Sequence, residues 1–217
     1  MKGKTLDFIT QTFHGKTISR ILFNWKVREL CSDVQGAVID LAGGHTASYF
    51  RYLPQERLSI TRTNIKEGED IGLVLDLNKP LPVKDAAYDA ALFFNALYIL
   101  ENPSRTLQEI CRILKPGGKL YLSIPFMTPE IPEPHDYVRF TREGLERLFQ
   151  EAGFEIVQIE KYGDRITSAA YLLHPFFVFS IVRLAANASA LFLSRLAGAR
   201  AKGAAPVGYF CICRRPV

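Results

Sequence analysis

Short apolar runs bounded by turn-forming residues recur along the chain, as is typical of buried strands. They predict strands at residues 37–41, 58–63, 73–75, 90–94, 119–124, 154–159 and 208–213. Between several of them, apolar residues spaced by three and four predict helices over 18–30, 46–53, 103–114 and 141–152. Strands that alternate with helices indicate an α/β fold, a doubly wound, seven-stranded and mostly parallel sheet.

The chain length of 217 residues suits one α/β domain with an elaboration. We expect an N-terminal helical segment over residues 1–35 and the sheet domain over 36–161 and 207–217. Residues 162–206 then form a helical hairpin inserted between the sixth and seventh strands, because 45 residues are too many for a plain loop.

The composition, with 48% hydrophobic and 23% charged residues, is that of a globular protein and excludes a disordered, collagenous or coiled-coil chain. Four scattered cysteines are too few for a disulfide framework or a zinc site, so no metal is expected. Cys211 and Cys213 alternate in a predicted strand and should share a buried face. The N-terminus shows no signal peptide, which predicts a cytoplasmic protein, and no nucleic-acid partner is expected.

The candidate ligand site lies where the strands end, because doubly wound sheets bind ligands beyond the carboxyl ends of their strands. The turn after the first strand contains Gly43-Gly44, and small residues let backbone N–H groups approach a nucleotide. Such a turn can also join a strand to a helix and bind nothing. About 20 residues on, where these folds place an acceptor for ribose hydroxyls, stands the amide of Asn64. A neutral hydrogen bond there predicts binding looser by about tenfold than a carboxylate would give.

A series of later segments is more specific. In order they are 76–82 (Asp-Leu-Asn-Lys-Pro-Leu-Pro), 88–90 (Tyr-Asp-Ala), 95–97 (Asn-Ala-Leu), 109–118 (Glu-Ile-Cys-Arg-Ile-Leu-Lys-Pro-Gly-Gly) and 123–126 (Ser-Ile-Pro-Phe). This series resembles the class I S-adenosylmethionine-dependent methyltransferases, in particular the type 11 group associated with bacterial surface-glycan and lipid-linked sugar pathways. The resemblance covers residues 34–160, and the Leu-Lys-Pro-Gly-Gly turn is its most telling part.

The resemblance implies S-adenosyl-L-methionine as the cofactor, held at the ends of the first four strands. Residue by residue, it places Asp40 and the turn Ala42-Gly43-Gly44 under the methionine part, Asn64 and Ile65 at the ribose, Asp76 and Leu77 at the adenine, and Asn95 below the sulfonium. The chain departs from the family pattern at three places. Ala42 and Thr46 replace two glycines, Asn64 replaces a carboxylate, and Ile99 replaces a frequent histidine.

A proline-rich loop before the helix at 141–152 supplies the candidate catalytic residues His135, Asp136, Tyr137 and Arg139. A similar segment occurs in the glycan-associated group, and its place at the carboxyl end of the sheet suits a lid over the acceptor. In one interpretation His135 is the base for a sugar hydroxyl. In the other, Asp136 and Arg139 pair to fix the loop and Thr141 caps the helix.

Positive charge and apolar residues coincide in the C-terminal part. Residues 1–161 hold 20 basic and 21 acidic residues, whereas 162–217 hold seven basic residues and Asp164 alone. Residues 166–182 contain no charged residue and fall just short of the ~20 that span a bilayer. Over 166–200 we therefore predict two helices that lie on the inner face of an anionic membrane, form a homodimer surface, or cover the active site.

The sequence thus predicts a methyltransferase that transfers a methyl group to a hydroxyl of a sugar or lipid-linked glycan acceptor. Methyl transfer depends mainly on positioning, so the cofactor cradle should identify the reaction best. The departures at Ala42, Thr46, Asn64 and Ile99 motivate an alternative, a catalytically degenerate protein of this fold that acts as a binding or membrane-scaffold module. Arg62, near the ribose position, suggests a nicotinamide-dependent dehydrogenase instead, but the Lys-Pro-Gly-Gly series disfavours it.

Overall fold

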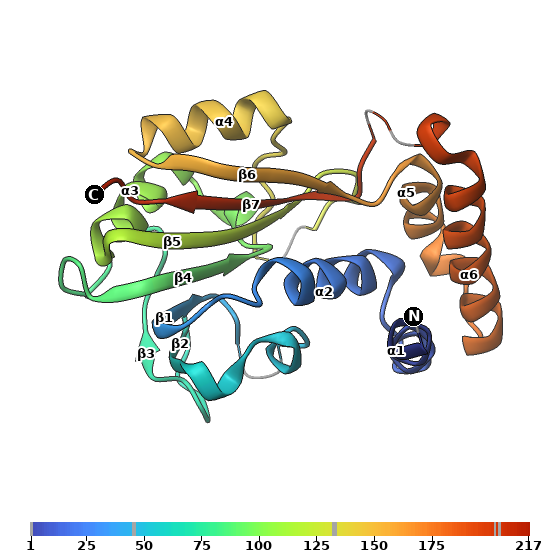
Figure 1. Cartoon of the computed structure of the whole chain (residues 1–217), viewed down its shortest axis with the longest axis horizontal. Coiled ribbons are helices and arrows are strands. Elements are labelled where there is room, and N and C mark those ends of the chain that lie inside the picture. Colours follow the sequence, from blue (N-terminus) through green and yellow to red (C-terminus); the bar gives the residue numbers. More distant parts are fainter. Residues whose placement is uncertain (1, 45–46, 132–133, 202, 204) are drawn as a thin grey trace.

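The computed structural model describes residues 2–44, 47–131, 134–201, 203 and 205–217. A seven-stranded sheet of order β3-β2-β1-β4-β5-β7-β6 forms its centre (Figure 1). The strands are β1 Gly36–Leu41, β2 Leu58–Asn64, β3 Leu73–Val74, β4 Tyr88–Phe94, β5 Leu114–Pro125, β6 Glu155–Tyr162 and β7 Gly208–Arg214. Strand β7 is antiparallel to β5 and β6, and the neighbouring pairs among β1 to β5 are parallel. The predicted mostly parallel α/β sheet is confirmed.

Helices cover both faces of the sheet. Successive strand residues point to opposite sides, so the apolar side chains of one strand contribute to a core on each face. On one face Val38 lies in a core with α2 (Ile18–Leu30) and the 3₁₀ helix Phe50–Tyr52. On the other, Ile39 lies in a core with α3 (Pro103–Ile113) and α4 (Arg142–Glu151). Cys211 and Cys213 are free, buried and both in this second core, as their spacing predicted.

The expected helix over 46–53 is wrong. Residue 46 lies outside the described residues, and the rest forms a turn and the 3₁₀ helix Phe50–Tyr52. A segment this short, ended by Pro54, gains too few hydrogen bonds to offset the cost of starting an α-helix. It instead buries Tyr49, Phe50 and Leu53 under the sheet.

The start of the fifth strand also differs from the expectation. The Leu-Lys-Pro-Gly-Gly segment does not precede the strand but lies inside β5, which begins at Leu114. Leu114 pairs with Tyr88 and Lys119 with Ala90, so the segment forms a bulge between these two pairs.

Three helices lie together beyond the carboxyl ends of the parallel strands. They are α1 (Lys2–Phe13), α5 (Arg165–Leu172), which follows β6 directly, and α6 (Ser180–Ala197) (Figure 1). Helix α6 packs against both α5 and α1. The 3₁₀ helix His174–Phe176 separates α5 from α6, which begins at Ser180. Among the described residues, none of the helices has both the length and the apolar character needed to cross a bilayer.

Candidate functional site

The order of the strands reverses between β1 and β4, and the residues that follow these two strands form the centre of the site. Ala42 follows β1 with φ 69°, and Asn95 follows β4 with φ 52°. Asparagine tolerates this left-handed conformation, whereas alanine pays about 1–2 kcal/mol for it. The turn therefore has a left-handed conformation that favours glycine, and Ala42 stores backbone strain in it.

Asp40 lies buried beneath this turn. Its two carboxylate oxygens lie 2.9 and 2.8 Å from the hydroxyl of Tyr49, which donates to them. Burial raises the pKa of Asp40 to about 7, although the Tyr49 hydrogen bond and the Arg62 charge act in the opposite direction. A Cβ atom at Gly43 would lie 2.0 Å from Oδ2 of Asp40, so the position requires glycine. Asp40 thus supports the turn from below, and in this conformation Tyr49 covers its carboxylate.

Gly44 follows at the outer end of the turn. It adopts φ 61°, and a Cβ atom there would meet no atom of the described residues within 4 Å. Toward the described part of the chain, the backbone of the turn is therefore accessible at Gly44.

Asn64 and Ile65 stand at the end of β2, next to β1. Oδ1 of Asn64 accepts a hydrogen bond from the Ile65 N–H at 2.8 Å, and the Ile65 side chain is exposed. The neighbouring Arg62 stacks on Phe50, with 4.2 Å from its guanidinium carbon to the ring centroid, and its Nη1 lies 3.2 Å from Oδ2 of Asp70. With these contacts Arg62 is already engaged by the protein, which weighs against a 2′-phosphate site.

Asp76 and Leu77 follow β3, next along the same edge. Oδ1 of Asp76 accepts a hydrogen bond from the Asn78 N–H at 2.9 Å, and the carbonyl of Leu77 accepts one from the Thr106 hydroxyl at 2.8 Å. Because β3, β2, β1 and β4 are neighbours in that order, the predicted cofactor residues lie along one rim.

The loop before α4 is held by a salt bridge. Arg139 donates to Asp136, which also accepts the Ile131 N–H at 2.8 Å, and the Arg139 hydrogen bond lowers the pKa of this carboxyl. The guanidinium of Arg139 lies 5.3 Å from the ring centroid of Tyr98, and the Tyr137 N–H donates to the Tyr98 carbonyl at 2.9 Å. Tyr98 follows Asn95 by three residues, so these contacts dock the loop beside the end of β4.

His135 is exposed on this loop, and its ring stacks on Tyr137 with 5.2 Å between centroids. Thr141 caps α4, accepting the Gly144 N–H at 3.2 Å. Asp136 and Arg139 have the loop-fixing arrangement of one interpretation, and the role of His135 stays a prediction.

Sequence reasoning missed three residues at this rim, namely Tyr49, Tyr98 and Arg20. Arg20 projects from α2, and its positive charge partly counters the burial that raises the pKa values of Tyr49 and Tyr98. Its side chain is half-buried and forms no salt bridge with the described part of the chain. The sequence carries no signal for the position of Arg20 near Tyr49 and Tyr98, because only the tertiary fold brings α2 to the strand ends.

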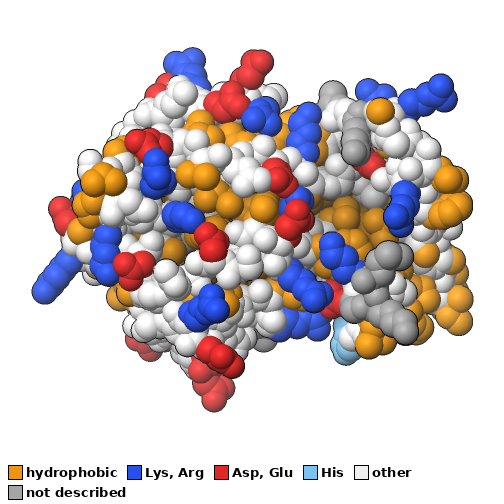
Figure 2. Space-filling view, in the orientation of Figure 1, with side chains coloured by type: hydrophobic (Ala, Val, Ile, Leu, Met, Phe, Trp, Pro, Cys, Tyr) orange, Lys and Arg blue, Asp and Glu red, His pale blue; other side chains and the backbone are white. Residues whose placement is uncertain are grey.

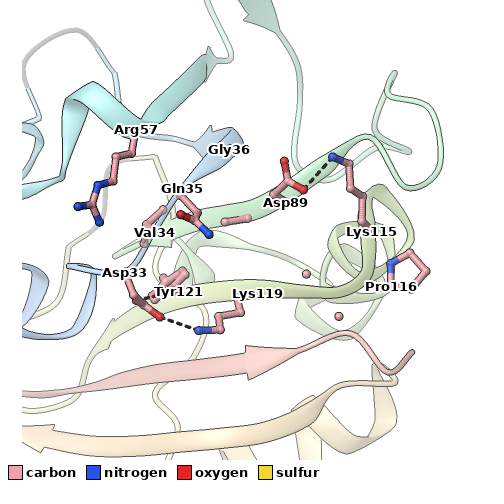
Figure 3. Close-up of a pocket in the computed structure, with 13 residues that line it drawn as sticks. Asp33, Val34, Gln35, Gly36, Arg57, Asp89, Lys115, Pro116, Lys119 and Tyr121 are labelled. Atoms are coloured by element: carbon pink, nitrogen blue, oxygen red, sulfur yellow. Dashed lines mark hydrogen bonds and ion pairs between the residues drawn. The ribbon is translucent and has the colours of Figure 1, made fainter.

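A hollow of about 720 Å³ lies at the opposite, amino-terminal end of the strands (Figure 3). The bulge of β5 lines it, and four of its charged side chains form two pairs: Lys115 with Asp89 at 2.8 Å and Lys119 with Asp33 at 2.7 Å. A Cβ atom at Gly118 would lie 2.8 Å from the Lys115 carbonyl oxygen. The Leu-Lys-Pro-Gly-Gly segment, the most specific motif of the sequence, therefore has a structural role. It lies at the end of the strands opposite to the rim.

A family model described as "Methyltransferase domain" matches residues 40–122, a range that includes Asp40, the turn, Asn64, Asp76 and Asn95. The S-adenosylmethionine-dependent methyltransferase from Mesorhizobium loti has a similar structure, with a TM-score of 0.59 and 18% identity over 88% of this chain and 97% of that chain. The chain has a class I methyltransferase fold.

Two further proteins are similar to this chain, one in structure over most of its length and one in sequence over less than half of it. The cyclase SpnF superimposes with a TM-score of 0.60 and 20% identity, over 91% of this chain and 81% of that chain. In sequence, the O-methyltransferase resE of Aspergillus sclerotiorum is 27% identical over 96 residues, which is 40% of this chain and 36% of that protein. The chain thus matches about a third of the length of this curated relative.

Proposed function

We propose that the protein is an S-adenosylmethionine-dependent methyltransferase. The observation that carries the proposal is that the family match begins at Asp40 and includes Asn64, Asp76 and Asn95, which stand at or just beyond the carboxyl ends of four neighbouring strands on one rim. A single extended ligand laid along the rim would meet the turn above Asp40 and then Asn64, Asp76 and Asn95.

The residues at the rim fit this cofactor. No described residue crowds a Cβ position at Gly44, which leaves room for a ligand against the turn. The Asn64 amide and the Asp76 carboxylate offer oxygens to ribose hydroxyls and to an amino group. When bound, the cofactor supplies an activated methyl group on its sulfonium. The protein's own contribution is then to hold the acceptor in line with that methyl group and to exclude water.

For the acceptor we propose a hydroxyl of a sugar or a lipid-linked glycan. The curated relative in the comparison is named an O-methyltransferase, which favours oxygen as the methylated atom. His135 is exposed on the loop that Arg139 and Tyr98 dock beside β4. From there a neutral imidazole would accept the hydroxyl proton while the oxygen attacks.

Two observations favour a second candidate, a degenerate protein that binds ligands without transferring a methyl group. Tyr49 covers the carboxylate of Asp40, and Ala42 puts strain into the turn. The likeness to the cyclase SpnF is a likeness of fold and does not distinguish the two candidates.

Calorimetry with S-adenosylmethionine and S-adenosylhomocysteine, followed by turnover assays on glycan acceptors, separates the candidates. Methyl transfer together with saturable binding of both ligands supports the methyltransferase. Binding without turnover on sugar hydroxyls supports the degenerate module, and absence of binding contradicts the cofactor assignment. Val157→Gln changes an exposed side chain of β6 that lies away from the rim, so it serves as a control. This variant should bind both ligands like the wild type.

A further inference from the structure

The helices beyond the carboxyl ends of the strands expose a large apolar surface, which we call the outer face. Its exposed side chains are Phe176, Val178, Phe179, Ile181, Val182, Phe192, Leu193 and Leu196. Ile181 is 74% exposed and Leu196 68%. Figure 2 shows hydrophobic side chains along the outer edge of the molecule, over α6, with Lys and Arg side chains near them. Such contiguous exposed patches mark interaction sites.

The periodicity of α6 shows that this surface does not cover the protein's own core. Ile181, Phe192 and Leu196 recur at intervals that place them on one side of the helix. Asn187 and Ala190 lie on the other side and are buried, toward α1 and α5. The helix therefore already has its intramolecular contacts on one side, and its apolar outer side faces away from the molecule.

Helix α1 also exposes apolar side chains beside α6. Leu6 and Phe13 are exposed on it, and α1 packs against α6. The acidic residue of α1, Asp7, is turned inward, where its carboxylate accepts hydrogen bonds from Trp25 and Tyr52 at 2.9 and 2.6 Å. The apolar side of α1 is therefore not interrupted by this negative charge.

The charges around the outer face have one sign. After Asp164 the chain contains no Asp or Glu residue. Arg165 at the start of α5, Arg195 in the last turn of α6 and Arg200 in the 3₁₀ helix Gly198–Arg200 that follows are exposed. Two copies meeting through this face would bring like charges together, which is unfavourable, whereas anionic lipid headgroups complement both the arginines and the apolar side chains.

We propose that the outer face docks on an anionic lipid bilayer, with α6 lying in the interface and its arginines at the headgroups. The face and the rim lie at the same end of the sheet, since α5 follows the carboxyl end of β6. If the proposed function holds, docking also brings the methyl-transfer site close to a membrane-borne acceptor. The docking itself does not depend on that function.

Sedimentation of the 217-residue chain with lipid vesicles tests the proposal. We expect retention by vesicles of phosphatidylcholine with phosphatidylglycerol, and much less by phosphatidylcholine alone. The variant Ile181→Gln/Leu196→Gln should lower the partition coefficient onto vesicles by about tenfold or more. Each loss of about 1.4 kcal/mol in binding free energy, here from apolar side chains no longer buried in the bilayer, lowers the coefficient tenfold. The matched control Val157→Gln/Val217→Gln, which also changes exposed apolar residues, should partition like the wild type.

A second pair of measurements keeps the test independent of folding effects. Arg195→Gln/Arg200→Gln, which changes exposed side chains, should weaken binding to the anionic vesicles severalfold, and added salt should do the same to the wild type. Equal retention of the outer-face variant and the control overturns the proposal. Sedimentation velocity without vesicles provides a second check. A dimer that forms in the wild type and is lost in the Ile181→Gln/Leu196→Gln variant would also overturn the proposal, because the outer face would then bind a second copy of the chain. Cofactor calorimetry on the same variants reports separately on the proposed function.

Discussion

The hydroxyl of Tyr49 lies within 2.9 Å of both carboxylate oxygens of Asp40, directly below the turn at Gly43. This contact joins the end of β1 to the segment nine residues later and leaves Asp40 fully buried. Because burial disfavours the charged carboxylate, the folded protein binds a proton here more tightly than the unfolded chain does.

The first prediction concerns Asp40→Asn, which keeps the shape of the side chain and removes its charge. The pKa of Asp40 rises from 3.8 to about 7 on folding, so the folded state is favoured by protonation. This contribution to stability is full below pH about 4 and is lost as the pH rises to about 7. The variant should therefore unfold like the wild type near pH 4 and be more stable near pH 8. The gain is up to about 4 kcal/mol, because one pKa unit corresponds to about 1.36 kcal/mol.

Urea unfolding at these two pH values measures the difference. Asp33→Asn is a useful comparison, because Lys119 and Tyr121 lower the pKa of Asp33, so its loss should cost stability at high pH instead. A difference between Asp40→Asn and the wild type that does not change with pH would contradict the burial argument.

The second prediction concerns the strain at Ala42. Glycine adopts a φ of 69° without the steric cost that alanine pays, so Ala42→Gly should relax the turn. We expect stability to change by no more than about 1 kcal/mol, because the gain is partly offset by the greater freedom of glycine in the unfolded chain. Binding of S-adenosylmethionine, measured by calorimetry, should tighten severalfold.

Ala185→Gly, at an exposed position inside α6, is the matched control. There the same chemical change should only destabilise, by about 1 kcal/mol, and should leave cofactor affinity unaltered. If Ala42→Gly weakens binding, the methyl group of Ala42 supports the ligand rather than crowding it.

The strands were predictable because their apolar runs are short and bounded by turn residues, and this also placed Asp40, Asn64, Asp76 and Asn95 at strand ends. The arrangement of the side chains within the site was harder to predict from the sequence. Tyr49 reaches Asp40 only because residues 47–53 fold as a turn and a 3₁₀ helix rather than the expected α-helix. That path is decided by packing under the sheet, which no local pattern in the sequence encodes.

The third prediction tests Arg20, a half-buried cation near the rim on α2. Under the proposed function its guanidinium is available to the carboxylate of the methionine part of the cofactor. Arg20→Gln should weaken S-adenosylmethionine binding by about tenfold or more, in line with charge-assisted hydrogen bonds of about 1.5–3 kcal/mol. Arg28→Gln, an exposed position on the same helix, should bind like the wild type. Equal affinities of the two variants would exclude Arg20 from the cofactor site.

The last prediction separates the two interpretations of the loop before α4. His135 is exposed and stacks on Tyr137, whereas Asp136 is tied to Arg139 and to the Ile131 N–H. If His135 accepts the acceptor proton, His135→Gln should lower kcat by about 100-fold or more and leave cofactor affinity unchanged. Arg139→Gln instead frees the loop from the Asp136 salt bridge, so it should raise KM for the acceptor. A His135→Gln enzyme with the kcat of the wild type would leave the loop a purely structural role.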